Sequence, residues 1–264
     1  SGTEVFSPNI CTGDGTANRV RSLPLTPDLA IGYRRDGTYK GHLIDRLRGK
    51  VALVVNNTSA DAGPYAGIEL VGANSNNTSI LDASDGGSTG YNINGWNYVA
   101  HYFKRATGFM DVVAYSGTGS AHTEAHNLGV VPELIILKGR SGPLAFNWAV
   151  YSKSILNTES LFLNYPDGKT NINNTYWNST TPTNTNFSLG SGSGVNASGG
   201  EFIAYLFATL AGVSKVGSYT GTGADLNVDC GFSAGARFIL IKRTNSTGNW
   251  FYWDYERGIT AGND

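Results

Sequence analysis

The feature that most constrains this chain is a short glycine motif that returns at a fixed interval. Tyr115–Gly119 reads Tyr-Ser-Gly-Thr-Gly, Tyr219–Gly223 reads Tyr-Thr-Gly-Thr-Gly, and Cys11–Gly15 is a weaker copy. The leading glycines stand at positions 13, 117 and 221, so the two intervals are 117 − 13 = 104 and 221 − 117 = 104 residues. Equal intervals of this length predict repeats of one domain type, each long enough to bury a core of its own.

The interval divides the chain into two full repeats and part of a third. We place an N-terminal connector at residues 1–10, repeat one at 11–107, repeat two at 108–211 and a partial repeat three at 212–264. Repeat three lacks counterparts of the later strands of repeat two, so we expect an open sheet edge and an uncovered apolar face there. Either further residues of the chain or another subunit would complete it.

Each repeat consists of short apolar runs separated by polar turns. Leu134–Lys138 and Glu201–Phe207 are rich in β-branched and aromatic residues, which favours strands. Tyr98–Phe103 matches the second of these runs at the repeat interval, and large side chains on both faces indicate a strand in the middle of a sheet. A helix over Phe202–Leu210 is the alternative, but the short length and aromatic content favour a strand. The sequence predicts an all-β protein of tandem, jelly-roll-like β-sandwich domains, two complete and one partial.

Charge and cysteine content limit the classes of partner. The net charge is −1, which provides no basic field for nucleic acid or an anionic membrane. The longest apolar run, residues 202–212, is too short to cross a bilayer. Cys11 and Cys230 lie in different repeats without cysteine counterparts, so neither a disulfide nor a metal framework is predicted. Neutral polar partners such as glycans, or other protein surfaces, remain.

Several motifs resemble functional sites, but their details favour structural roles. The Thr-Gly-x-Gly motif lacks the Lys-Ser/Thr and the following helix of a phosphate loop, so it indicates a tight turn. His122 and His126 have no third metal ligand nearby, which favours exposed or hydrogen-bonded histidines. Asp82 and Asp85 could hold calcium, yet the twelve-residue calcium-loop pattern is absent and a solvated turn is favoured. We expect neither a metal nor a cofactor.

Acidic residues raise the alternative of a glycosidase. The candidates for an acid and base pair are Glu124, Glu133, Glu159 and Glu201. The other repeats have no matching acids: Glu133 is replaced by Asp28 or Arg237, and Glu201 by Asn97. A repeated fold without a repeated catalytic set argues against an enzyme.

Two aromatic and charged patterns recur between repeats and favour a structural role. Trp148 and Trp250 occupy equivalent positions, each after an Asn and ahead of a strand, which favours a place in the core. Asp45-x-x-Arg48-Gly and Asp254-x-x-Arg257-Gly also match, which favours an ion pair that braces a turn.

Four loop aromatics are the candidate ligand contacts. They are Tyr91, Trp96, Tyr176 and Trp177, and they lie among Asn, Ser and Thr residues. Aromatic rings stack on sugars while the neighbouring polar groups supply hydrogen bonds, so these residues are the candidates for a glycan contact. Packing of the loops or an inter-subunit contact is the interpretation that the sequence favours.

The order of motifs in repeat two resembles a known group of proteins. The motifs are Tyr115–Gly119, His126–Lys138, Asn147–Tyr151, Thr181–Gly190 and Phe202–Ala208. Together they resemble tandem domains in tail-fibre and other virion proteins of tailed bacteriophages, especially marine and cyanobacterial ones. Repeat one departs most, because it lacks the Asn-Leu-Gly and the Asn-Trp.

The resemblance implies a structural and adhesive component on the outer surface or tail of a virion, most simply a tail-fibre segment. It implies a homo-oligomer that is exposed to the host and contacts other virion proteins, and it brings no catalytic residues. Together with the loop aromatics, it makes a host-surface glycan the expected ligand. A capsid-decorating or cell-surface glycan-binding adhesin is the first alternative. A polysaccharide depolymerase is the second, and it would require one cleft with paired acids.

Overall fold

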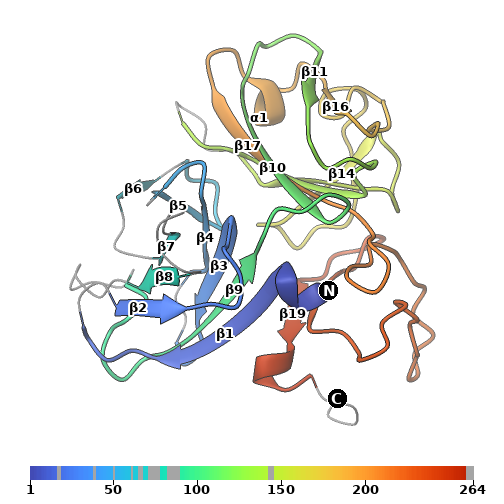
Figure 1. The fold of residues 1–264 in the computed structure, drawn as a ribbon. Coiled ribbons are helices and arrows are strands. Elements are labelled where there is room, and N and C mark those ends of the chain that lie inside the picture. The colour runs from blue at the N-terminus through green and yellow to red at the C-terminus, as the bar shows by residue number, and fades with distance from the viewer. Residues whose placement is uncertain are drawn as a thin grey trace.

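The computed structural model describes residues 1–264 except 17–18, 38–39, 50, 61, 65–67, 71–77, 82–89, 142–145 and 260–264; at 62–64, 69 and 78–81 it describes the backbone alone. Antiparallel strands form nearly all of the regular structure in this described part (Figure 1). The helical elements are the 3-10 turns η1 (Gly2–Glu4) and η2 (Tyr255–Arg257) and the single-turn helix α1 (Ser193–Asn196). The prediction of an all-β protein is confirmed.

Two six-stranded sheets carry the fold. The first contains β1 (Phe6–Thr12), β3 (Leu29–Arg34), β4 (His42–Asp45), β5 (Val51–Val54), β6 (Ala62–Pro64) and β9 (Asn97–Phe103). The second contains β10 (Met110–Ser116), β12 (Leu134–Gly139), β13 (Ala149–Ser152), β14 (Glu159–Phe162), β15 (Thr170–Asn171) and β17 (Glu201–Phe207). Their spatial orders are β1-β9-β3-β4-β5-β6 and β10-β17-β12-β13-β14-β15, so equivalent strands occupy equivalent places.

Three smaller groups of strands complete the described part. One sheet has the order β2-β8-β7, with β2 (Arg19–Ser22), β7 (Ile68–Leu70) and β8 (Thr78–Leu81). A second pairs β11 (His122–Ala125) with β16 (Asn186–Leu189). The third is a hairpin of β18 (Phe238–Lys242) and β19 (Trp250–Asp254). We call β1–β9 unit one, β10–β17 unit two and β18–β19 unit three; they form three groups of strands around a common centre (Figure 1).

The equivalent strands lie at the interval seen in the sequence. β1 and β10 begin at 6 and 110, β9 and β17 at 97 and 201, and β12 and β18 at 134 and 238, so each pair is offset by 104. β1 uses residues 6–12, and Phe6 is buried. Residues 6–10, which are half of the expected N-terminal connector, therefore belong to a strand of the first sheet.

Alternation of side chains along β17 shows why the strand carries large residues on both faces. Phe202, Ala204 and Leu206 point into a core that β17 shares with β16 and α1, which we call the unit-two core. Ile203 and Tyr205 point to the opposite side, into a second core. A strand exposes successive side chains to opposite faces. The strand interpretation is confirmed, and the helix alternative for this segment is excluded.

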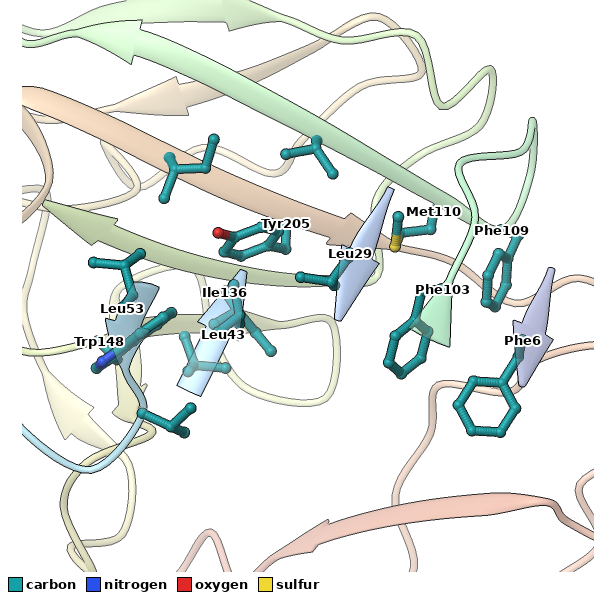
Figure 2. Close-up of a cluster of buried hydrophobic side chains, with 14 of the residues drawn as sticks. Phe6, Leu29, Leu43, Leu53, Phe103, Phe109, Met110, Ile136, Trp148 and Tyr205 are labelled. Atoms are coloured by element: carbon teal, nitrogen blue, oxygen red, sulfur yellow. The ribbon is translucent and has the colours of Figure 1, made fainter. Parts of the chain in front are cut away.

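The second core joins the three units. It takes Phe6, Leu43 and Phe103 from the first sheet and Tyr205 from the second (Figure 2). Trp148, just before β13, also belongs to it. The rings of Phe238 and Trp250 pack against it from unit three. We call this cluster the shared core. A further cluster, the unit-one core, lies on the other face of the first sheet and includes Tyr91 and Tyr98.

Candidate functional site

Buried asparagines clamp the glycine motifs in units one and two. Asn196 Oδ1 accepts a hydrogen bond from the Thr118 N–H, and its Nδ2 donates to the carbonyls of Ser120 and Gly190; all three distances are 2.7 Å. Asn92, 104 residues earlier, accepts from the Asp14 N–H at 3.1 Å and donates to the Thr16 carbonyl at 2.8 Å. These loops lie against polypeptide of their own unit.

Close packing explains the glycines of the motif. A Cβ on Gly117 would lie 2.2 Å from the Ala197 carbonyl oxygen, and one on Gly13 would lie 2.0 Å from that of Ile93. Gly119 has φ +76°, a left-handed conformation that glycine adopts without steric strain. The geometry is that of a tight turn, as the sequence predicts.

The four predicted ligand contacts lie in two different places. Tyr91 is 4% exposed in the unit-one core, where its hydroxyl donates to the Gly32 carbonyl at 2.6 Å. Trp177 is 2% exposed in the unit-two core. Trp96 is half-buried, with the Arg34 guanidinium 3.4 Å from its ring centre, and Tyr176 is half-buried beside Trp177. Surface for a ligand remains at Trp96 and Tyr176 only.

Tryptophan side chains connect neighbouring units through matching hydrogen bonds. The Trp148 indole of unit two donates to the Val54 carbonyl at the end of β5 in unit one, at 3.0 Å. The Trp250 indole of unit three donates to the Phe162 carbonyl at the end of β14 in unit two, at 2.9 Å. Donor and acceptor occupy equivalent positions in both pairs. The expected core position of Trp148 is confirmed, and the core is the shared one.

Two lysines, on β12 and β18, likewise donate to carbonyls of the neighbouring unit. Lys138 Nζ donates to the Thr58 carbonyl of unit one at 2.9 Å, and Lys242 Nζ donates to the Pro166 carbonyl of unit two at 3.0 Å. Lys138 is fully buried. Neither lysine was predicted to contact another unit, although the fixed 104-residue offset between two lysines in apolar strands was a usable signal.

The Asp/Arg pairs brace turns and also contact a neighbouring unit. Asp45 Oδ2 lies 2.6 Å from Arg48 Nε, and its Oδ1 accepts from the Arg48 N–H at 3.1 Å. The Tyr205 hydroxyl of unit two donates to Asp45 Oδ2 at 2.6 Å. Both charged side chains are at most 1% exposed. The predicted turn brace is confirmed, and the sequence did not reveal the contact with unit two.

The second pair has a histidine where the first has a tyrosine. Asp254 in unit three forms an ion pair with Arg257, and His101 Nε2 lies 2.9 Å from Asp254 Oδ2. His101 precedes Tyr205 by 104 residues, so the two are equivalent. The His101 ring packs among aromatic rings, with centroids 5.1 Å from Phe238 and 5.7 Å from Tyr252.

Burial and hydrogen bonding shift the pKa values of this histidine and aspartate. Burial lowers the pKa of His101 more than the hydrogen bond to Asp254 raises it. Burial by itself would raise the pKa of Asp254, but the hydrogen bonds from His101 and Arg257 outweigh it and lower the pKa to about 2. The folded state therefore favours a neutral His101 beside an ionised Asp254.

These shifts predict two steps of acid destabilisation. Because the unfolded chain binds the His101 proton more readily, stability should fall as the pH drops below about 6.5, the ordinary histidine value. Stability from Asp254 should be lost only between about pH 4 and pH 2. His101→Tyr copies the contact of unit two, so it should flatten the melting temperature between pH 7 and pH 5. Thermal melts over pH 2–8 check this. The prediction is contradicted if the melting temperatures of the unaltered and His101→Tyr proteins change equally with pH between pH 7 and pH 5.

The remaining charged candidates have local partners. His122 Nε2 lies 3.0 Å from Glu124 Oε1, and His126 Nε2 lies 3.1 Å from the Thr183 carbonyl oxygen. Of the other acids, Glu133 pairs with Lys153, Glu159 with Lys169 and Glu201 with Arg140. Within the described ranges, no three His, Cys, Asp or Glu side chains are grouped as metal ligands would be. Asp82 and Asp85 lie outside the described residues.

Comparison with known proteins identifies one family. The model of a domain of unknown function, DUF7483, matches residues 1–263, which span all three units. The chain belongs to this family. No curated protein and no solved structure matches this DUF7483 chain. In the part of the chain that the structure describes, no helix is both long and apolar enough to cross a membrane.

Proposed function

We propose that this chain is a structural and adhesive component of a phage particle, most simply a tail-fibre segment. In this proposal, units one and two are β-sandwiches of one repeat, and unit three is the first half of another. The three pack around the shared core as a rigid block.

The contacts between units support a ring arrangement. Asp45 of unit one meets Tyr205 of unit two, and Asp254 of unit three meets His101 of unit one. The two aspartates are equivalent, and so are their partners Tyr205 and His101. Each aspartate contacts the unit that follows its own in the cyclic order one, two, three, one. The lysine and tryptophan contacts follow this order between units one and two and between units two and three.

One observation carries the proposal: the tryptophan–carbonyl bond that recurs between successive units. The Trp148–Val54 and Trp250–Phe162 hydrogen bonds join equivalent positions of successive units. Trp148 belongs to the shared core, and Trp250 packs against it. Units joined by one repeated contact suit an appendage that must resist mechanical force. The low charge, the polar loops and the motif order that resembles virion proteins agree with this role.

Adhesion would use the loops outside the cores. Trp96 and Tyr176 stay the predicted glycan contacts, since they retain exposed surface among polar residues. A weak contact of this kind becomes effective when many copies are presented together, because avidity grows with the number of linked sites. The proposal includes a homo-oligomer for this reason.

Electron microscopy of particles tests the proposal directly. Antibodies raised against the recombinant chain should label purified particles of a phage that encodes it, with immunogold on the tail. Label confined to the capsid would replace the tail-fibre assignment by a capsid-decorating adhesin. Particles without label, when an antibody to a known virion protein labels them well, would overturn a role in the virion.

A further inference from the structure

Unit three presents an apolar face that its counterpart in unit two buries. Phe251 and Trp253 are 52% and 44% exposed, and their rings stack on one another. Their equivalents Ala149 and Tyr151 are at most 4% exposed, inside the unit-two core. The opposite face of the same hairpin packs on the shared core through Phe238 and Trp250. Unit three is therefore held in place while one of its faces stays uncovered.

The same hairpin has an unpaired edge. In units one and two the strands equivalent to β18 pair on both sides: β3 lies between β9 and β4, and β12 lies between β17 and β13. In the described residues β18 pairs with β19 alone. A strand edge of this kind offers a row of N–H and C=O groups to another strand.

The glycine loop of unit three has the bend without the clamp. Gly223 has φ +81°, close to the +74° and +76° of Gly15 and Gly119. Gly117 faces the Ala197 carbonyl, whereas a Cβ on Gly221 would meet no atom within 4 Å. Among the described residues, nothing occupies the place beside Gly221 that the asparagine segment fills beside Gly117 in unit two.

We propose that the open face of unit three is a docking surface for a closing segment of the repeat. This segment has an asparagine that clamps the glycine loop and, five residues later, begins a strand with large side chains on both faces, as Asn92 precedes β9 and Asn196 precedes β17. The strand pairs with β18 and covers Phe251 and Trp253.

A polypeptide of this type fits better than the other occupants. The unpaired edge requires backbone groups, the loop requires a carboxamide, and the apolar face requires large side chains, and a closing segment supplies all three. A second copy of the chain is a poor donor, because its closing strands β9 and β17 are each held between two neighbours. The inference rests on the equivalence of the units and is independent of a role in a virion.

A chimaera tests the surface. Residues 260–264 are replaced by a second copy of residues 159–209, which places the closing segment of unit two after unit three at the matching point. The melting temperature should rise by at least about 4 °C. Binding of a hydrophobic dye, anilinonaphthalene sulfonate, should fall relative to the 264-residue chain. Hydrogen–deuterium exchange of the β18 peptide, read by mass spectrometry, should slow.

Two controls separate docking from simple lengthening. The same graft with residues 201–207 scrambled should leave dye binding and β18 exchange as they are in the 264-residue chain. The graft with Asn196→Leu in the added copy only should slow hydrogen–deuterium exchange of β18 but leave exchange of the peptide around Gly221 fast.

Equal dye binding and equal β18 exchange in the intact and scrambled grafts would overturn the inference. So would a 264-residue chain that dimerises in solution with β18 already protected, since a second copy would then be the occupant. Neither result bears on immunogold labelling of particles, so the two proposals fail independently.

Discussion

Trp148→Ala should lower the free energy of unfolding by about 3–5 kcal/mol, the range for removing a large buried aromatic side chain. Trp148 is fully buried in the shared core, and its indole N–H satisfies the Val54 carbonyl of the neighbouring unit. Truncation therefore opens a cavity between units one and two and leaves that carbonyl without its indole donor. Urea denaturation followed by circular dichroism gives the change, from the midpoint and the slope.

Trp253→Ala is the matched control for this prediction. Trp253 is 44% exposed on the open face of unit three, so its removal should change stability by less than about 1 kcal/mol. Trp148→Phe keeps most of the packing but removes the donor, and it should fall between the two. If the Trp148→Ala protein were as stable as the Trp253→Ala protein, packing in the shared core would not be a main source of stability.

Asp45→Asn is expected to have an effect of similar size, about 3–5 kcal/mol, for an electrostatic reason. The substitution keeps the shape of the side chain but removes the charge that balances Arg48, and breaking one side of a buried ion pair leaves the other charge uncompensated. Arg48 is 1% exposed, so water cannot replace the lost partner. The Tyr205 hydroxyl loses a charged acceptor at the same time.

The control is an ion pair near the surface. Glu201 lies 3.2 Å from Arg140 and is 39% exposed, so Glu201→Gln should change stability by less than about 1 kcal/mol. Both variants carry the same chemical change, from carboxylate to carboxamide, and denaturation at pH 7 compares them. A loss below about 1 kcal/mol for Asp45→Asn would show that the pair contributes little to the contact between units.

Patterns within a strand made much of the fold predictable. Continuous apolar runs bounded by turn residues specify where a strand lies and that it has two buried faces, as in Glu201–Phe207. They do not specify which segment covers each face. The position of Trp148 in a core followed from its repetition, but that its core includes residues of unit one depends on packing between segments about 94 residues apart in sequence.

The loop aromatics show a second limit of the sequence. Tyr91 and Trp177 lie among polar residues, yet both rings turn back into a core. Composition cannot distinguish them from the half-buried Trp96 and Tyr176. One signal existed for Tyr91: Gly32 interrupts an apolar strand, and a Cβ there would lie 2.4 Å from the Tyr91 ring. A glycine inside a strand often marks such a close approach.

The contact between His101 and Asp254 also affects how the chain is made. These residues are 153 positions apart, so unit one is synthesised long before the segment that covers this part of it. At about 5–20 residues per second, the interval on the ribosome is roughly 8–30 s. For most of that time Phe6 and Phe103 have no Phe238 to pack against. Nascent and prematurely terminated chains thus expose an aromatic surface that is prone to aggregate. Chaperone binding to ribosome-attached chains should therefore be strongest before unit three emerges.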